Sequence, residues 1–206
     1  MIYYSIEKMI EAGITEILII SGIEHCGSII SQCGDGSEFG CNLTYKVQKD
    51  AGGIAQALLL AETFVGKDDV LVILGDNISN ANLTEYVNSF EHGGMIFLHE
   101  VYDPSRFGVA EINTDGTVID IVEKPALPKS NLAVTGFYIY DKTVFKKIKT
   151  LKPSARGELE ITDVNKLYLK DKKLNAVILD KNLWWSDAGT FESLSKVNSL
   201  LAMRKK

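Results

Sequence analysis

The sequence predicts an α/β protein with a mixed, mainly parallel sheet and an added antiparallel hairpin. Three observations support this class. Short apolar runs alternate with helical patterns through the first hundred residues, as in strand–helix–strand units. The run V-L-V-I-L at 70–74 is followed at once by a Gly-Asp-Asn triplet at 75–77, so polar groups stand where a buried strand ends. The Asp-Gly pair at 115–116 joins two alternating runs, which is typical of a β-hairpin.

Hydrophobic spacing predicts the elements of the first half in order. Residues 1–12 place four apolar side chains on one helical stripe, and Gly13 ends that helix. The run E-I-L-I-I at 16–20 predicts a strand buried on both faces, followed by a polar, glycine-rich passage. Further strands are expected at 43–47, 70–74 and 95–101, and further helices at 54–64 and 82–90. This alternation predicts right-handed crossovers, with ligands bound beyond the carboxyl ends of the strands.

The second half of the chain has a different pattern. The hairpin is expected at 107–124, a strand at 134–140 and a short helix at 141–148. Residues 160–169 have amphipathic helical spacing, and 191–201 predicts a final helix. No internal repeat or long linker divides the sequence, so the whole chain is predicted to be one domain.

Composition and charge exclude several classes of function. The 206 residues are 46% hydrophobic and 24% charged, which is typical of a globular protein with a substantial core. No apolar run reaches the roughly 18 residues of a membrane helix, and charged residues interrupt the pattern of a secretory signal. A net charge of −5 argues against a nucleic-acid partner but leaves a small anionic ligand open. The three cysteines match no zinc spacing and are interpreted as reduced thiols of a cytoplasmic protein.

Asp76 and Asp187 are the candidate metal ligands. Asp76 follows a buried strand, and Asp187 lies in W-W-S-D-A-G-T at 184–190, just before the glycine that opens the last helix. Two carboxylates can hold Mg²⁺ together with water and phosphate oxygens. Each acid alone is equally well explained as a turn or helix cap, so the metal site requires that the two meet in space.

Three charged residues could bind a phosphorylated sugar. Glu123 could accept hydrogen bonds from sugar hydroxyls and Lys124 could contact a phosphate, although such a pair is often only a solvated surface pair. The forked donors of Arg156 also suit a phosphate.

Gln48, Gly53 and Gly108 each have two interpretations. An amide such as that of Gln48 can pair with the edge of a pyrimidine, or it can simply be solvated. The two glycines are either turn residues or positions where a ligand approaches the backbone closely.

Taken together, the motifs resemble those of the sugar-phosphate nucleotidyltransferases. The segments that carry the resemblance are, in chain order, Y-K-V-Q, G-G-I-A-Q-A, L-G-D-N, R-F-G-V-A-E, V-E-K-P-A, N-L-A-V-T-G-F-Y-I-Y-D, A-R-G-E-L-E-I-T-D-V-N and W-x-D-A-G-T. They extend over essentially the whole chain. The resemblance implies a three-layer, Rossmann-like nucleotide-diphospho-sugar transferase fold with its first strand absent. It also implies a mainly nucleotide-binding half at 1–105 and a mainly sugar-phosphate-binding half at 106–190.

The resemblance also assigns roles to particular positions. Asp76 and Asp187 match the Mg²⁺ ligands, and with Lys124 and Arg156 they form the implied catalytic set. The implied substrate-binding residues are Gln48 and Gly53 for the pyrimidine base, Gly108, Glu123, Val134 and Tyr138 for the sugar, Lys124 and Arg156 for its phosphate, and Trp185.

The reaction implied by the resemblance joins dTTP to α-D-glucose 1-phosphate, giving dTDP-glucose and pyrophosphate for nucleotide-sugar and polysaccharide biosynthesis. The implied partners are these small molecules, with neither nucleic acid nor membrane, and a homo-oligomer is left open. One alternative is a related enzyme that uses UTP or another nucleoside triphosphate. Another is a non-catalytic subunit that binds a sugar nucleotide. A glycosyltransferase of similar architecture is the third, although E-K-P and R-G-E-L-E-I-T-D argue against it.

One departure from the family concerns the start of the chain. Family members begin with a buried strand, a G-G-x-G-T-R-L loop and a following lysine, and this chain starts at the Met of their P-M-I-Y-Y segment. The comparison therefore suggests that the first strand, the glycine-rich turn that holds the triphosphate, and two cations are absent. A truncated chain or a misassigned start is favoured over a naturally short form.

The chain as written is therefore expected to show little or no turnover. Without the loop, transition-state stabilisation falls by several kcal/mol, by analogy with deletion of a single oxyanion donor. Pyrophosphate release from dTTP and glucose 1-phosphate with Mg²⁺ measures this, with a reaction lacking Mg²⁺ as the blank. Turnover at ordinary enzyme rates, about 1–10³ s⁻¹, would contradict the expectation.

Overall fold

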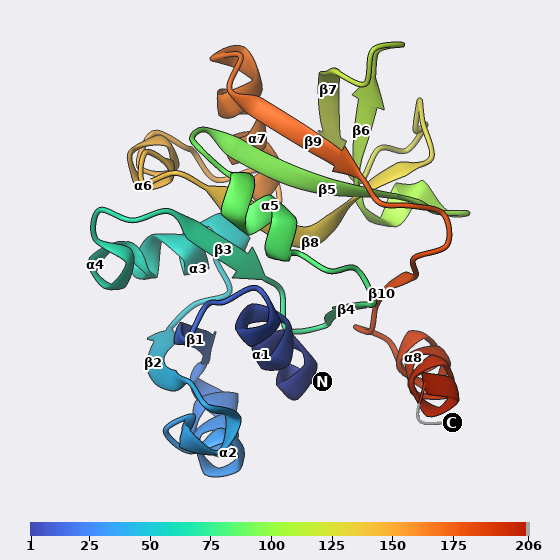
Figure 1. Ribbon diagram of the computed structural model, residues 1–206. Helices are drawn as coiled ribbons and strands as arrows, with labels where there is room; N and C mark the ends of the chain where they lie inside the picture. Colours follow the sequence, from blue (N-terminus) through green and yellow to red (C-terminus); the bar gives the residue numbers. More distant parts are fainter. Residues whose placement is uncertain (205–206) are drawn as a thin grey trace.

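A computed structural model describes residues 1–204, leaving out the side chains of Lys196 and of residues 201–204. Its strands form separate groups (Figure 1). The strands are β1 (Glu16–Gly22), β2 (Asn42–Gln48), β3 (Val70–Ile73), β4 (Asn77–Ser79), β5 (Gly94–Glu100), β6 (Gly108–Ile112), β7 (Val118–Glu123), β8 (Leu132–Tyr140), β9 (Leu174–Ile178) and β10 (Trp185–Asp187). β1 and β2 form a parallel pair, and β4 and β10 form an antiparallel pair.

The main sheet has six strands and is organised around β8. Its order is β7–β6–β8–β5–β9, and β3 also pairs with β8. β3, β5 and β6 are all antiparallel to β8 and so share one direction, which β9 also follows because it is parallel to β5. β6 and β7 form the hairpin expected at 107–124. The prediction of a mixed α/β sheet with an added hairpin is therefore confirmed.

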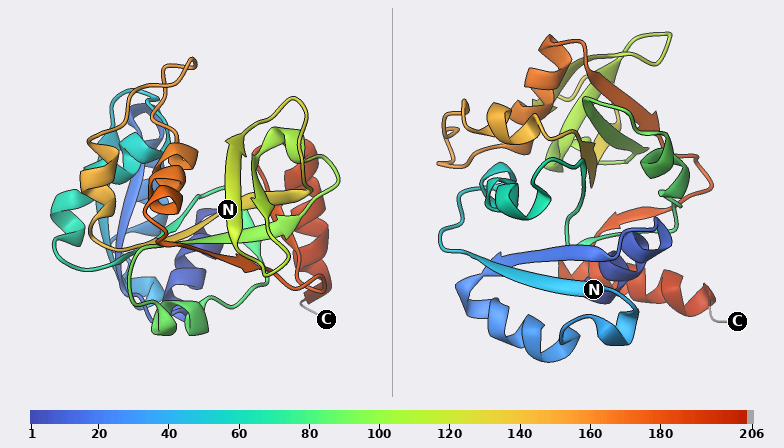
Figure 2. Two further views of the ribbon diagram at one scale, coloured as in Figure 1. Left: turned by 90° about the horizontal axis from the view of Figure 1, so that it is seen from above. Right: turned by 60° about the vertical axis from the view of Figure 1, so that its left-hand side comes forward.

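Helices cover both faces of this sheet, which gives three layers (Figures 1 and 2). The helices are α1 (Ile2–Glu11), α2 (Ile23–Cys33), α3 (Ile54–Leu60), α4 (Glu62–Val65), α5 (Thr84–Ser89), α6 (Val144–Ile148), α7 (Ile161–Lys170) and α8 (Phe191–Arg204), with short 3₁₀ turns at Ser37–Phe39 and Pro104–Arg106. Tyr138 and Tyr140 of β8 pack in one core cluster with residues of α3, α6 and α7. Phe137 and Ile139 point to the opposite face and pack with residues of α5. Alternation along one buried strand thus separates the two cores.

The structure differs from the sequence-based expectation in three places. The polar passage after β1 contains the helix α2, whose apolar side chains lie among serine and glycine and give a weak signal. The helix expected at 54–64 is divided into α3 and α4 at Ala61. The strands β9, β4 and β10 were not expected; the last two are only three residues long, too short for alternation to reveal.

Two further observations bear on the class of protein. None of the described helices combines the length and apolar character that crossing a bilayer requires. The three cysteines are free, with Cys33 and Cys41 buried and Cys26 half-buried. Burial raises the pKa of the Cys33 and Cys41 thiols, so both stay protonated at neutral pH.

Replacing Gly27 or Gly136 by alanine is expected to change the free energy of unfolding in opposite directions. A Cβ added to Gly27, inside α2, would meet no atom within 4 Å, so Gly27→Ala should stabilise the fold by about 0.5–1 kcal/mol. A Cβ on Gly136 would lie 2.4 Å from Asn77 Cγ, so Gly136→Ala should destabilise it by about 1–3 kcal/mol. Urea denaturation measures both free energies of unfolding. Equal stabilities for the two variants would contradict the described packing.

Candidate active site

A cavity of about 350 Å³ opens where β3 ends. Leu74 and the following Asp76 belong to its wall, and the other walls come from β6, β7, β8, β10 and the segment before α7. The predicted site residues that it brings together are Asp76, Gly108, Glu123, Lys124, Val134, Tyr138, Arg156, Trp185 and Asp187. Gln48 and Gly53 are not among its lining residues, although Ile54, next to Gly53, is.

Asp76 and Asp187 converge at one end of this cavity. β4 and β10 pair with Asp187 opposite Asn77, and the Ala188 backbone N–H donates to the Asp76 carbonyl oxygen at 2.7 Å. A Cβ placed on Gly189 would lie 2.9 Å from Asp187 Oδ1 and 3.4 Å from Asp76 Oδ2. Both carboxylates therefore face one small space that glycine leaves open. Two hard oxygen donors beside such a space fit Mg²⁺.

The side chain of Asn77 fixes the position of the Asp76 carboxylate. Its amide N–H donates to Asp76 Oδ1 at 2.8 Å, while its Oδ1 accepts from the Gly136 backbone N–H at 2.8 Å and from Trp185 Nε1 at 2.7 Å. Asn77 is only 6% exposed, so these bonds satisfy an amide with little access to water. Sequence reasoning placed Asn77 in the crevice but gave it no role; its adjacency to Asp76 was the available signal.

Glu123, which also lines the cavity, is held by a residue that sequence reasoning missed. Thr162 Oγ1 donates to Glu123 Oε2 at 2.5 Å. A Cβ on Gly108 would lie 3.3 Å from that same carboxylate oxygen and 3.2 Å from Thr162 Oγ1. Gly108 therefore leaves room for this contact. The signal for Thr162 was its place in the R-G-E-L-E-I-T-D motif, one residue after the start of α7.

Arg156 lies among three carboxylates. Its Nε and Nη2 donate to Glu160 Oε1 at 3.1 Å and Oε2 at 2.7 Å, a bidentate pair. Nη2 is also 3.3 Å from Glu158 and 3.7 Å from Glu123. These hydrogen bonds and charges raise the pKa of Arg156, so the guanidinium stays cationic. The Arg156 side chain is still 41% exposed, so solvent reaches it despite these contacts.

Lys124 has an uncommon backbone conformation at the end of β7. Its φ of 42° lies in the left-handed region, which costs a non-glycine residue about 1 kcal/mol or more. The Lys124 backbone N–H donates to the Phe107 carbonyl oxygen at 2.9 Å, which anchors the residue at the cavity wall. The sequence placed Lys124 at the strand end but gave no indication of this strain.

The remaining wall is largely apolar. Tyr138 is buried on β8, and burial, followed by the charges of Glu123 and Asp76, raises the pKa of its phenol, so the hydroxyl remains neutral. Val134 lies on the same strand and is also buried. The Trp185 ring packs edge-on against Phe107 with centroids 5.2 Å apart. A neutral aromatic wall of this kind suits the faces of a sugar ring.

Gln48 and Gly53 lie together beside the cavity. Gln48 Nε2 donates to the Gly53 carbonyl oxygen at 3.2 Å and to Gln56 Oε1 at 2.8 Å. Gly53 has a φ of 95°, and a Cβ there would lie 2.5 Å from the Leu159 carbonyl oxygen. Gly53 is thus required by backbone packing, whatever it does to a ligand.

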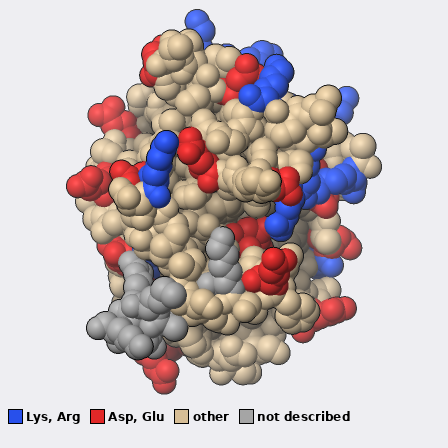
Figure 3. Space-filling view, turned by 90° about the vertical axis from the view of Figure 1, so that its right-hand side faces the viewer, with Lys and Arg blue, Asp and Glu red and all other residues tan. Residues whose placement is uncertain are grey.

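The cavity contains more carboxylates than cations, which affects how an anionic ligand can bind. Five carboxylates line it, from Asp76, Glu123, Glu158, Glu160 and Asp187, against the cations of Arg106, Lys124 and Arg156. Figure 3 shows basic and acidic side chains interspersed on one face of the molecule, with no broad basic patch there. A phosphate would therefore need either displacement of carboxylate pairs or a divalent cation.

Comparison with known proteins identifies the family of this chain. The family profile of nucleotidyl transferases matches residues 1–204. A glucose-1-phosphate thymidylyltransferase of Neisseria meningitidis serogroup A is 43% identical over 205 residues, covering 98% of this chain and 71% of the relative. The thymidylyltransferase of Mycolicibacterium smegmatis is also 43% identical, over 94% of this chain and 68% of its own length.

A crystal structure gives the same result for the fold. A Bacillus anthracis protein assigned as a glucose-1-phosphate thymidylyltransferase, crystallised with sucrose, is 51% identical with a TM-score of 0.91. The match covers 97% of this chain and 81% of that one. The chain belongs to the nucleotidyl transferase family, and the expected class of enzyme and its fold are confirmed.

The contacts of Glu160 are expected to make the stability of the fold depend on pH. Burial by itself raises the pKa of Glu160, but hydrogen bonds from Arg156 and Ser154 outweigh burial and hold it below the ordinary 4.5. A depressed carboxyl pKa stabilises the fold above the unfolded pKa, and this contribution is lost as pH falls through the folded pKa. Glu160→Gln should therefore cost about 1–3 kcal/mol at neutral pH, and less below about pH 4.

Thermal and urea unfolding between neutral pH and about pH 3 measure this difference. Glu158→Gln is the matched control, because Glu158 makes one contact of 3.3 Å with Arg156 and is 34% exposed. Glu158→Gln should change the free energy of unfolding only slightly at any pH. A penalty for Glu160→Gln that does not change with pH would contradict the assignment.

Proposed function

We propose that this chain serves the transfer of a thymidylyl group from dTTP to α-D-glucose 1-phosphate, giving dTDP-glucose and pyrophosphate. The observation that carries the proposal is the convergence of Asp76 and Asp187 in the cavity that also contains Glu123, Lys124 and Arg156. The names of the relatives at 43% identity and of the similar crystal structure support the choice of base and sugar.

Asp76 and Asp187 are proposed to hold Mg²⁺. Among the described residues no group of three or more His, Cys, Asp or Glu side chains could bind a metal, so water and ligand oxygens would complete the shell. When bound, Mg²⁺ would neutralise phosphate oxygens in a cavity that is otherwise rich in carboxylates. Asn77 would keep the Asp76 carboxylate oriented throughout.

The wall formed by Glu123 is proposed to bind the sugar. Held by Thr162, the Glu123 carboxylate would accept hydrogen bonds from hydroxyls, and Gly108 would allow the ring to approach the backbone. Val134 and Tyr138 would face the apolar side of the ring.

Lys124 and Arg156 are proposed to bind the sugar phosphate. The bidentate contact with Glu160 fixes the plane of the Arg156 guanidinium, so the phosphate would meet a preorganised cation. The phosphate oxygen would then attack the α-phosphorus in line. Positioning and charge neutralisation are the main contributions of the protein to such a transfer, and no covalent intermediate is needed.

The base is proposed to lie beside Gln48 and Gly53. The Gln48 amide would exchange its present partners, Gly53 and Gln56, for the pyrimidine edge. Trp185 would contribute to the adjoining wall. The nucleotide half would then lie at 1–105 and the sugar-phosphate half at 106–190.

We also propose that the product supplies polysaccharide biosynthesis in the cytoplasm. A nucleotide-activated glucose is the donor that glycosyl transfer consumes, and dTTP and glucose 1-phosphate are cytoplasmic metabolites. Reduced Cys26, Cys33 and Cys41 are compatible with that compartment.

Binding of dTDP-glucose tests the proposal without depending on turnover. We expect calorimetry with Mg²⁺ to detect dTDP-glucose and to give UDP-glucose at least about tenfold weaker affinity, a difference of about 1.4 kcal/mol. Asp187→Asn should lower the affinity at least about tenfold with Mg²⁺ and much less in EDTA, since the variant removes a metal ligand.

Asp180→Asn is the matched control, because Asp180 caps a turn outside the cavity and should leave the affinity unchanged. Equal affinity for the two sugar nucleotides would overturn the choice of base. An Asp187→Asn penalty that persists in EDTA would overturn the metal site.

A further inference from the structure

Arg106 is a cation of the cavity without a close partner among the described residues. It ends the short 3₁₀ turn Pro104–Arg106 and lines the cavity that contains Asp76 and Asp187. Its Nη2 lies 4.0 Å from Asp187 Oδ2, at the outer limit of an ion pair. Within the part of the chain that the structure describes, the guanidinium donates no hydrogen bond. Its N–H donors are therefore available to a ligand.

The backbone of Arg106 is fixed, while its side chain is free to move. The Phe107 backbone N–H donates to the Pro104 carbonyl oxygen at 3.0 Å, and the Phe107 carbonyl oxygen accepts from the Lys124 backbone N–H at 2.9 Å. The guanidinium carbon of Arg106 lies 5.5 Å from the centroid of the Phe107 ring, which packs in turn against Trp185. This cation–π contact uses none of the N–H donors, and the side chain is 50% exposed.

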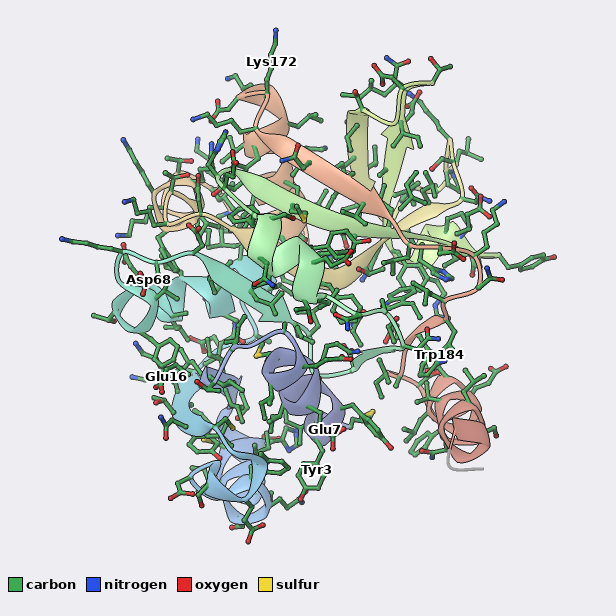
Figure 4. The ribbon with its side chains drawn as sticks, viewed as in Figure 1. Tyr3, Glu7, Glu16, Asp68, Lys172 and Trp184 are labelled. Carbon is green, nitrogen blue, oxygen red and sulfur yellow. The ribbon has the colours of Figure 1, made fainter. Side chains whose placement is uncertain are left out.

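Asp187, by contrast, is held in place. Its Oδ1 accepts from the Gly189 backbone N–H at 2.8 Å. The segment before it is anchored at Trp184, whose backbone N–H donates to Asn80 Oδ1 at 2.7 Å. Figure 4 shows Trp184 at this segment, beside α8. If the two charged groups separate, Arg106 is therefore the one that moves.

Arg106 would compete with a divalent cation for Asp187. Asp76 and Asp187 are the proposed metal ligands, and Arg106 stands beside one oxygen of Asp187. Unit charges at this separation interact appreciably even near a protein surface. The guanidinium therefore offsets the negative charge of Asp187 and opposes the arrival of a second cation.

A phosphate offers Arg106 a better partner than Asp187 does. The forked donors of a guanidinium match two phosphate oxygens, in bonds that are shorter and stronger than a contact of 4.0 Å. To reach a phosphate, Arg106 would break no hydrogen bond with the described residues. Arg156 differs in this respect, because its Nε and Nη2 already donate to Glu160. Arg106 is thus the guanidinium of the cavity that can change partners at little cost.

We propose that Arg106 is a phosphate-binding residue that exchanges Asp187 for a phosphate of the bound nucleotide. The inference rests on the proposed function, because it takes Asp187 as a ligand of Mg²⁺. At Asp187, the guanidinium weakens binding of the metal alone; at the phosphate, it no longer opposes the metal. The nucleotide therefore raises the affinity for the metal, and the metal raises the affinity for the nucleotide by the same factor. The chain then binds the two together more readily than either alone.

Two simpler roles of Arg106 predict different behaviour. A solvated surface pair with Asp187 would change neither affinity when it is removed. A cation that stayed at Asp187 while attracting the phosphate would change both affinities but not the factor that couples them, because the contributions of fixed charges add. Only an exchange of partners makes the coupling factor itself depend on Arg106.

Metal binding by Arg106→Gln, with and without dTDP-glucose, tests the proposal. Mn²⁺ prefers the same oxygen ligands as Mg²⁺, and its binding is measured by electron paramagnetic resonance. We expect the variant to bind Mn²⁺ alone at least about threefold more tightly than the wild type, because the competing charge is lost. The factor by which dTDP-glucose raises the affinity for Mn²⁺ should fall at least about fivefold.

Lys129→Gln is the matched control for the loss of one positive charge. Lys129 Nζ lies 3.1 Å from Glu111, and Lys129 is not among the residues that line the cavity. Its replacement should leave both Mn²⁺ affinities and the coupling factor unchanged. Arg106→Lys keeps the charge beside Asp187, so its affinity for Mn²⁺ alone should stay within about twofold of the wild type.

The outcomes separate this inference from the proposed function. An unchanged coupling factor in Arg106→Gln would overturn the exchange of partners and leave the proposed function standing. An affinity for Mn²⁺ alone that is equal or weaker in Arg106→Gln would overturn the competition for Asp187. A wild-type chain that binds neither Mn²⁺ nor dTDP-glucose would overturn both proposals.

Discussion

The buried amide of Asn77 connects the segments on which the candidate site depends. Through it, the backbone of β8 at Gly136, the ring of Trp185 on β10 and the carboxylate of Asp76 are held within one hydrogen-bonded group. Because these segments are far apart in sequence, the amide links distant parts of the chain and gives the Asp76 carboxylate a fixed position. Each of its partners would leave a buried polar atom unsatisfied if it moved away.

Charged groups of the cavity are also held in place before a ligand binds. Arg156 is surrounded by carboxylates, and Glu123 is fixed by Thr162, so the polar groups of the cavity are already oriented before any ligand enters. Carboxylates outnumber cations there, and therefore an anionic substrate and a divalent cation would favour each other's binding. The left-handed backbone of Lys124 is strained, and strained residues of this kind are held in place where a side chain must occupy a particular position.

The elements with strong periodicity were predictable, and the weak ones were not. The long apolar runs that became β1, β3 and β8 and the stripe that became α7 stand out in the sequence. α2 was missed because serine and glycine dilute its apolar positions, and Ala61 divides a helix whose composition is continuous. The roles of Thr162 and Asn77 were missed although both lie in recognisable motifs, because the partner of a hydroxyl or a buried amide, such as Glu123 or Gly136, is distant in sequence.

The sequence by itself determined the α/β class, the family motifs and which residues could carry charge into a site, because periodicity and residue chemistry are local properties. Only the tertiary structure decided that Asp76 and Asp187 share one space, and that Arg156 is already paired with Glu160. Such relations depend on distances between segments, which no single stretch of sequence records.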